Sequence, residues 1–303
     1  MLRLRSAAVA AIMLVAACGP GGGASTAPTS GPATAGPATA APASAGPTSE
    51  VIAPPTSLLT PGKIVDCVDI EYPPMEYFPS ADITDPNQAV GFDVDAAKAV
   101  AAKLGLEIEI RNTAFNALIP DLQAGRCDIV WTALYVNETR LEVADAVPYM
   151  ATCQVVMVKA GNAVGIRAIT DLCGKTVSVQ GAGLVEERIT KASADCVAAG
   201  SPAINIQAYE KVADEFQQII LGRVDAVWET DTGVSNFLLE HPGEYEVAFA
   251  FPREDNYGVY YTKGATDLGT ALQAAIDALN ADGTLPGIAE KYEMDPAILE
   301  VVE

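Results

Sequence analysis

The stretch AGRCDIVWTALYVNETR, residues 124–140, gives the clearest indication of the fold. Gly125 is a typical helix-ending residue, and the run at 129–134 that follows it is almost wholly apolar. A short apolar run after a glycine indicates a strand that is buried on both faces, as in a parallel sheet. Asn137 then has the character of a helix cap, which places Arg140 in the first turn of a following helix. The stretch therefore predicts an α/β fold.

A second copy of this pattern occurs further along the chain, as LGRVDAVWETD at residues 221–231. Both copies contain Gly-Arg, one residue, Asp, a short apolar run and a tryptophan, which is Trp131 in the first copy and Trp228 in the second. The shared position of the tryptophan argues against a chance match. The repeat predicts two similar α/β lobes that face one another across a ligand-sized cleft.

The remaining pattern alternates strand-like and helix-like segments, so each lobe should be a mostly parallel sheet flanked by helices. The apolar segment CQVVMVK, residues 153–159, is expected to cross from one lobe to the other, and a return strand is expected near YGVYYT at 257–262. Lobe 1 would then be discontinuous, formed by residues 62–154 and 252–303, and lobe 2 would comprise residues 155–251. Two connecting strands are what a hinge requires.

The first residues have the character of an export signal rather than of a fold. Arg3 and Arg5 precede an apolar run that is too short to span a bilayer, which predicts a signal peptide at residues 1–17. The run ends in Leu-Val-Ala-Ala-Cys, a lipobox-like motif, so Cys18 is the expected lipidated N-terminus. The alternative is an ordinary signal peptide that is cut nearby. We expect an exported protein that is lipid-anchored to the outer face of a bacterial cell membrane.

Residues 18–61 are dominated by Gly, Pro, Ala, Ser and Thr. Such a segment cannot bury enough apolar surface to offset its ordering entropy, so it is predicted to be a disordered linker between anchor and domain. An O-glycosylated stalk is an alternative interpretation of the same composition.

The net charge excludes some partners. The whole chain carries −21, and its first sixty residues contribute +1, which leaves −22 on the part expected to fold. Such a balance argues against binding nucleic acid and against lying on anionic lipid.

The cysteine pattern predicts disulfides, because the protein is expected to be exported. Five cysteines follow Cys18 and none forms a CxxC pair: Cys67, Cys127, Cys153, Cys173 and Cys196. The chain has a single histidine, so a zinc or haem site is not expected. Cys67 and Cys127 lie in or at predicted neighbouring strands, and Cys173 and Cys196 flank one strand–helix unit. We expect these two pairs, with Cys153 free and buried.

The candidate ligand site lies beyond the strand ends, where open α/β sheets bind ligands. Arg140 is placed there, and its guanidinium would hold a ligand carboxylate with two parallel hydrogen bonds. The alternative is a surface arginine paired with Glu138 or Glu142. Asp69 and Tyr72 follow the first predicted strand and would face the same crevice.

Further candidate residues come from the starts of predicted helices. Phe115 heads one helix and with Tyr72 would enclose a ligand side chain, although a core position is a competing interpretation. GAG at 181–183 half-matches a dinucleotide fingerprint, but Glu186 and Glu187 oppose a pyrophosphate, so a smaller anion is favoured. Asp231 would bind an ammonium group from lobe 2 and so favour closure, or would cap a helix.

Enzyme signatures are missing from the sequence, which contains no GxSxG, HExxH or Walker motif. We therefore predict no catalytic residues, no cofactor and no metal, and classify the chain as a non-enzyme.

Several motifs together resemble the family 3 extracellular solute-binding proteins, the receptors of polar amino acid ABC importers. The resemblance covers residues 62–295 and is carried by the following segments: CVDIEYPPME (67–76), GFDVD (91–95), FNALIPDLQAG (115–125), ETR (138–140), DAVPY (145–149), DGT (282–284) and KY (291–292). It implies a periplasmic-binding-protein type II fold with two lobes, a two-strand hinge and closure on one amino acid.

The resemblance also implies residue roles. Arg140 matches the carboxylate-binding arginine, Tyr72 and Phe115 match the enclosing aromatic residues, and Asp69 matches an acid at the polar end of the ligand. Asp231 matches the ammonium-binding aspartate, with Thr230 as a rival.

Other positions depart from the family pattern. The segment 132–135 supplies Thr132, Ala133 and Tyr135, of which Ala133 offers only its backbone N–H and Tyr135 replaces a small hydroxyl residue. Gly183 and Leu184 stand where the family offers Ser/Thr-Thr, so an aromatic, N-modified or smaller zwitterion is a conceivable ligand.

The sequence thus predicts a monomeric, lipid-anchored receptor that delivers an amino-acid-like solute to a membrane permease. A dehydratase-like enzyme on the same fold and a sensor that binds without transport are the alternatives.

Overall fold

The computed structural model describes residues 52–303, and residues 50–303 form one compact unit. The predicted signal peptide (1–17), Cys18 and most of the predicted linker (18–61) lie outside the described residues. In the part that is described, no helix combines the length and the apolar character needed to cross a membrane.

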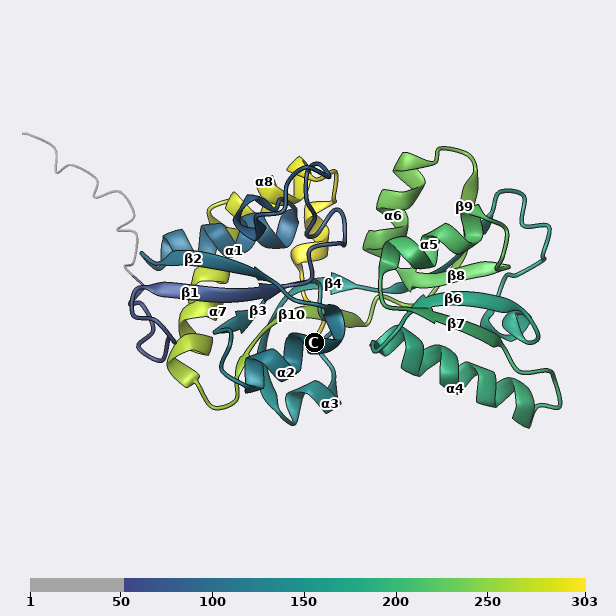
Figure 1. Cartoon of the computed structure of the whole chain (residues 1–303), viewed down its shortest axis with the longest axis horizontal. Helices are drawn as coiled ribbons and strands as arrows, with labels where there is room; N and C mark the ends of the chain where they lie inside the picture. Colours follow the sequence, from purple (N-terminus) through teal and green to yellow (C-terminus); the bar gives the residue numbers. More distant parts are fainter. Residues whose placement is uncertain (1–51) are drawn as a thin grey trace, which may run out of the picture. The chain divides into compact units, whose positions relative to one another are not determined.

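The fold contains two five-stranded sheets (Figure 1). The sheet of lobe 1 has the order β2-β1-β3-β10-β4, with β1 (Lys63–Val68), β2 (Glu107–Asn112), β3 (Ile129–Val130), β4 (Ala144–Thr152) and β10 (Asp255–Thr262). The sheet of lobe 2 has the order β7-β6-β8-β5-β9, with β5 (Gln154–Lys159), β6 (Thr176–Gln180), β7 (Asn205–Tyr209), β8 (Ala226–Thr230) and β9 (Tyr245–Ala250). In each sheet four strands run in the same direction and one, β10 in lobe 1 and β5 in lobe 2, runs antiparallel to both of its neighbours, so the predicted two-lobed α/β fold is confirmed and both sheets are mixed.

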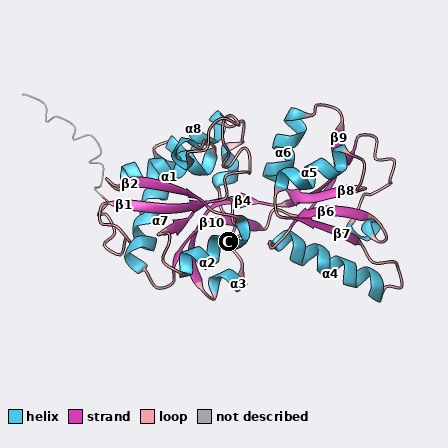
Figure 2. Ribbon diagram, viewed as in Figure 1, coloured by secondary structure: helices cyan, strands magenta, loops and turns pink. Residues whose placement is uncertain are grey.

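Helices flank both sheets (Figure 2). Lobe 1 contains α1 (Phe92–Lys103), α2 (Leu118–Gln123), α3 (Glu138–Leu141), α7 (Thr266–Ala281) and α8 (Thr284–Lys291). Lobe 2 contains α4 (Leu184–Ala198), α5 (Val212–Ile220) and α6 (Asp231–Glu240). The 3-10 turns are η1 (Pro86–Gln88), η2 (Phe115–Ala117), η3 (Ile169–Leu172) and η4 (Pro296–Leu299). The last helices of the chain pack on α1, which returns the C-terminal segment to lobe 1.

Two chain crossings join the lobes. β4 continues into β5 with only Cys153 between them, and the chain returns from β9 to β10. β10 is inserted between β3 and β4, so the sheet of lobe 1 is completed by a segment that follows the whole of lobe 2.

The strand that we expected at residues 129–134 is shorter than predicted, because β3 ends at Val130. The residues after it leave the extended conformation, and Ala133 has a φ of 43°, a left-handed value that is unusual for alanine. The helix predicted after Asn137 does form, with the Asn137 side chain accepting a hydrogen bond from the Arg140 N–H at 2.8 Å.

The folded unit begins before the boundary at residue 62 that the composition indicated. Asp267, at the start of α7, accepts hydrogen bonds from the backbone N–H groups of Thr56 and Ser57 at 2.7 and 3.0 Å. Asp128 accepts a hydrogen bond from the Leu59 N–H at 2.7 Å. Two side chains of lobe 1 therefore hold the last residues of the predicted linker.

The two expected disulfides are confirmed. Cys67 joins Cys127 and Cys173 joins Cys196, with Cα atoms 5.8 and 5.6 Å apart. Cys153 is free and buried, as expected. Each bond lies within one lobe, so neither restrains the movement of the hinge.

Candidate functional site

Two cavities lie where the strand ends of the two lobes meet, and each is lined by residues from both lobes. The outer cavity has a volume of about 560 Å³, and the inner one of about 30 Å³. Asp69 and Phe115 line both cavities, so the two lie next to each other. The inner cavity also contains five other predicted ligand-binding residues: Tyr72, Thr132, Ala133, Tyr135 and Gly183.

Buried carboxyl groups fix the loop after β3, which forms the lobe 1 side of the inner cavity. The Trp131 N–H donates to Asp66 at 2.9 Å, and the Ala133 N–H donates to Asp93 at 2.6 Å. The Thr132 hydroxyl donates to Glu76 at 2.8 Å. Each of the first three loop residues is thus held by its own buried acid. Since the Ala133 N–H points to Asp93, it is not the free donor that the sequence suggested.

Burial changes the ionisation of these acids. It raises the pKa of Asp93 to about 7, against the effect of the hydrogen bond from Tyr149. The pKa values of Asp66 and Glu76 are also raised by burial. Loss of solvent likewise raises the pKa of Asp69, and in lobe 2 that of Glu229, to about 7. The inner end of the cleft therefore contains carboxyl groups that bind protons more readily than exposed ones.

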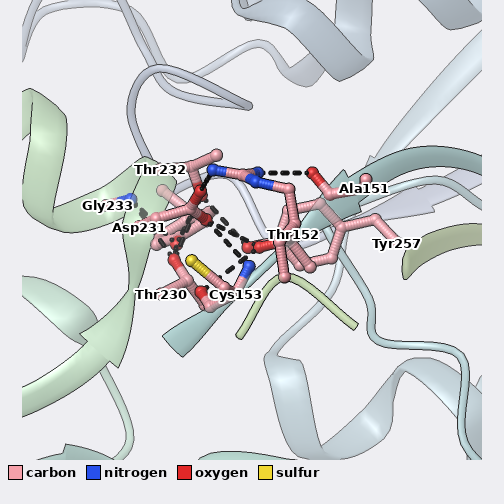
Figure 3. A network of polar contacts seen from close by, with 10 residues as sticks. Ala151, Thr152, Cys153, Thr230, Asp231, Thr232, Gly233 and Tyr257 are labelled. Atoms are coloured by element: carbon pink, nitrogen blue, oxygen red, sulfur yellow. Dashed lines mark hydrogen bonds and ion pairs between the residues drawn. The ribbon is translucent and has the colours of Figure 1, made fainter. Parts of the chain in front are cut away.

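Tyr72 connects the lobes through its hydroxyl group. This hydroxyl is hydrogen-bonded to Thr230, lies 3.1 Å from the Thr232 hydroxyl and accepts a hydrogen bond from the Gly233 N–H at 3.2 Å. Thr232 in turn lies 3.0 Å from the hydroxyl of Tyr257 on β10 (Figure 3). A side chain of lobe 1 is thus bound at the first turn of α6 in lobe 2.

This contact requires a glycine at position 233. A Cβ atom added there would lie 2.9 Å from two atoms of the Tyr72 side chain, which is closer than carbon atoms approach without displacement. Gly233 lies inside α6, where alanine is otherwise the better helix former.

Arg140 lies beside the cavities without lining either of them. Its guanidinium donates to the Tyr135 carbonyl at 2.9 Å and lies 5.9 Å from the centre of the Phe115 ring. Burial lowers its pKa. Among the described residues it forms no ion pair, so the alternative pairing with Glu138 or Glu142 is not observed.

Asp231 lies at the hinge and does not line either of the two cavities. Its carboxylate accepts hydrogen bonds from the Thr152 hydroxyl at 2.8 Å and the Cys153 N–H at 3.3 Å (Figure 3), and pairs with Arg253 at 2.5 Å. The cap of α6 is Thr230. In this arrangement Asp231 ties the β4–β5 crossing to the start of α6.

The glycine loop at residues 181–183 closes on itself. The Ala182 N–H donates to the Glu186 carboxylate at 2.7 Å, so one of the expected anion donors is already occupied. Gly183 lies against Phe115 of lobe 1, since a Cβ atom placed on it would meet that ring at 3.3 Å.

Acids that line the inner cavity or hold its loop were not predicted from the sequence, among them Glu76, Asp93 and Glu229. Each lies in a segment that was quoted for another purpose, namely 67–76, 91–95 and the repeat at 221–231. The signal that could have found them was an acid beside buried residues in these segments. No group of three potential ligands among residues 52–303 is arranged to hold a metal ion.

Comparisons with known proteins agree with this arrangement. The family model described as bacterial extracellular solute-binding proteins, family 3, matches residues 64–295. The L-cystine-binding protein TcyJ of Escherichia coli K12 is 28% identical over 228 residues, covering 73% of this chain and 79% of TcyJ.

Two solved structures are similar over most of their length. An ancestral arginine-binding protein bound to arginine superposes with a TM-score of 0.69 at 29% identity, covering 76% of this chain and 98% of its own. The substrate-binding protein of an amino acid ABC transporter superposes with a TM-score of 0.66 at 30% identity, covering 76% of this chain and 99% of its own.

The Tyr72–Gly233 contact predicts a non-additive pair of substitutions. Gly233→Ala should lower the free energy of unfolding by about 1 to 3 kcal/mol, because the new methyl group displaces the Tyr72 side chain. In a Tyr72→Ala background the same substitution should raise the free energy of unfolding by about 1 kcal/mol, because alanine is a better helix former than glycine. Urea unfolding of the four chains measures this coupling. An equal effect of Gly233→Ala in both backgrounds would show that the contact contributes nothing.

The raised pKa of Asp93 predicts a pH dependence of stability. A carboxyl group with a folded-state pKa of about 7 stabilises the fold fully at low pH, and that contribution is lost as the pH rises toward and through 7. Asp93→Asn should flatten this decline and be more stable than the wild type above pH 7. Asparagine is tolerated because Ala133 and Tyr149 both donate to the same Asp93 oxygen, which the amide carbonyl can replace. Urea unfolding of the wild type and of Asp93→Asn between pH 5 and pH 8 measures the two free energies of unfolding. If they change with pH in parallel, the prediction is refuted.

Proposed function

Because the chain belongs to the bacterial extracellular solute-binding proteins, family 3, we propose that it is the substrate-binding lipoprotein of an ABC importer. Its ligand is an amino acid or a similar solute that binds between the lobes through its amino group. The observation that carries the proposal is the pair of adjoining interlobe cavities, to which both lobes contribute side chains. The named relatives support it, since they bind cystine and arginine and one serves an amino acid ABC transporter.

The proposed binding set follows the lining of the cavities. Asp69 is the partner of the ligand amino group, and Phe115 and Tyr72 enclose the ligand. The inner wall includes the other predicted positions, namely Thr132, Ala133, Tyr135 and Gly183. Arg140 donates one guanidinium N–H to the Tyr135 carbonyl and keeps others that a ligand carboxylate could use, and we assign Asp231 to the hinge.

Closure follows from the way in which the lobes are connected. Besides the Tyr72 contact, Glu71 pairs with Lys211 at 3.2 Å, and Arg188 pairs with Asp255 through two bonds of 2.6 and 2.7 Å. The lobes are therefore held by a small number of polar contacts around two connecting segments. A ligand that touches both lobes adds interactions only to the closed arrangement and shifts the population toward it.

The chain acts here as a receptor and not as an enzyme. In this proposal it is exported, anchored to the outer face of the bacterial cell membrane through Cys18, active as a monomer, and delivers its ligand to a membrane permease. The lipobox-like motif before Cys18 and the family membership support this location.

Ligand binding is tested by a thermal-shift screen of the full-length chain in detergent against amino acids, cystine and aliphatic amines. A ligand at about a hundred times its dissociation constant adds about 2.7 kcal/mol of stability. Asp69→Asn should abolish most of this shift because the ligand amino group loses its charged partner. Asp121→Asn, which changes an acid outside both cavities, is the control. The proposal fails if no solute shifts the transition, or if the shift survives Asp69→Asn unchanged.

The anchor is tested by cell fractionation. Cys18→Ser should move the chain from the membrane fraction to the soluble fraction, because the serine hydroxyl cannot receive the lipid thioether. Cys153→Ser, which alters the buried free cysteine, should leave it in the membrane fraction. A Cys18→Ser chain that remains with the membrane would refute the lipoprotein assignment.

A further inference from the structure

The lining of the two cavities is strongly acidic. Six carboxyl groups contribute to it: Asp69, Glu71, Glu76, Glu186, Glu210 and Glu229. Lys211 is the one basic residue in either lining, and it already pairs with Glu71 at 3.2 Å. A ligand in this space therefore meets carboxyl groups from both lobes, and a cationic group would favour their ionised form whereas a ligand carboxylate would oppose it.

The groups that would hold a ligand carboxylate are occupied elsewhere in the protein. Arg140 donates to the Tyr135 carbonyl and lines neither cavity. The Ala133 N–H donates to Asp93, and the Ala182 N–H donates to Glu186. Gly183 brings no hydroxyl group to the inner cavity. The Ala133 and Ala182 N–H groups would thus have to break existing hydrogen bonds in order to bind a carboxylate.

The inner cavity contains an unused hydrogen-bonding group. The Tyr135 side chain lines it, is only 5% exposed, and its hydroxyl has no hydrogen-bond partner in the described part of the chain. A buried hydroxyl without a partner is costly, and a phenolic oxygen can accept a hydrogen bond from an ammonium group. Asp69, Glu76 and Glu229 line the same cavity, and an ammonium group there would favour their ionised form.

The sizes of the cavities indicate how a ligand would be divided between them. The inner cavity, at about 30 Å³, has room for a group the size of one water molecule, such as an ammonium head. The outer cavity, at about 560 Å³, accommodates the rest of a small molecule between the aromatic rings of Phe78, Phe115 and Tyr209. Glu186 and Glu210 provide a second set of carboxylates there.

We infer that the interlobe site binds an organic dication, an aliphatic diamine or a guanidino amine, and does not require an α-carboxylate. One cationic head enters the inner cavity between Asp69, Glu229 and the Tyr135 hydroxyl. The aliphatic chain passes Phe115, and the second cationic head meets Glu186 and Glu210 in the outer cavity. The inference rests on the proposed function, because it names the class of solute for the same cleft.

The experiment compares ligands that differ only in the carboxylate. Calorimetric titration of the full-length chain uses three pairs: arginine with agmatine, lysine with cadaverine, and ornithine with putrescine. We expect at least one amine to bind about tenfold more tightly than its amino acid. Equal or tighter binding of the amino acid in every pair overturns the inference and leaves the proposed function standing. The absence of binding by any amino acid or amine overturns both.

Two variants separate the two charged ends of the site. Glu229→Gln should weaken a diamine and a monoamine of equal length, for example cadaverine and amylamine, because both use the inner cavity. The double variant Glu186→Gln with Glu210→Gln should weaken cadaverine at least fivefold and leave amylamine unchanged. Glu300→Gln, at an acid that lines neither cavity, is the control for charge alone. Equal losses for the two amines in the double variant would overturn the assignment of the outer carboxylates.

Discussion

The site depends on one set of interactions, the hydrogen bonds that the loop after β3 donates to the buried acids Asp66, Glu76 and Asp93. Placing three carboxyl groups in the interior of lobe 1 is costly unless they are protonated or hydrogen-bonded. Here they accept hydrogen bonds from three successive residues, and one of these residues, Ala133, is held at a positive φ. These bonds hold the loop in its non-extended conformation, and Tyr135, which follows it, lines the inner cavity. The constraint that shortens β3 is thus the same one that builds the inner cavity.

The connection between the lobes has a different character. It consists of two crossing segments, one tyrosine hydroxyl at a helix start, and ion pairs such as Arg188 with Asp255. Each lobe has its own disulfide, whereas buried apolar residues of both lobes belong to one cluster. In the proposed function, a ligand acts by bringing these two lobes together. The acids at the cleft then determine which ligands can hold those halves together.

Much of the architecture could be predicted because it depends on local patterns. The repeated Gly-Arg-x-Asp segment, the apolar strands and the Asn137 cap all act within a few residues, and the cysteines lie at predictable strand and helix ends. The site was predicted less completely because its partners are distant in sequence. Nothing near Asp231 indicated that its carboxylate would meet Arg253, and nothing near Ala133 indicated that its N–H would be taken by Asp93. The burial of Glu229 is set by neighbouring elements that only the folded chain brings together.

The position of β10 between β3 and β4 has a consequence for the order in which the chain acquires its structure. Lobe 2 is continuous and can complete its sheet as soon as β9 has been synthesised. Lobe 1 cannot complete its sheet until β10 has been synthesised. Until then, the edges of β3 and β4 that pair with β10 are unpaired and open to other strands. Lobe 1, which begins first in the chain, is therefore completed last. During export it is the part of the protein that most needs protection from aggregation.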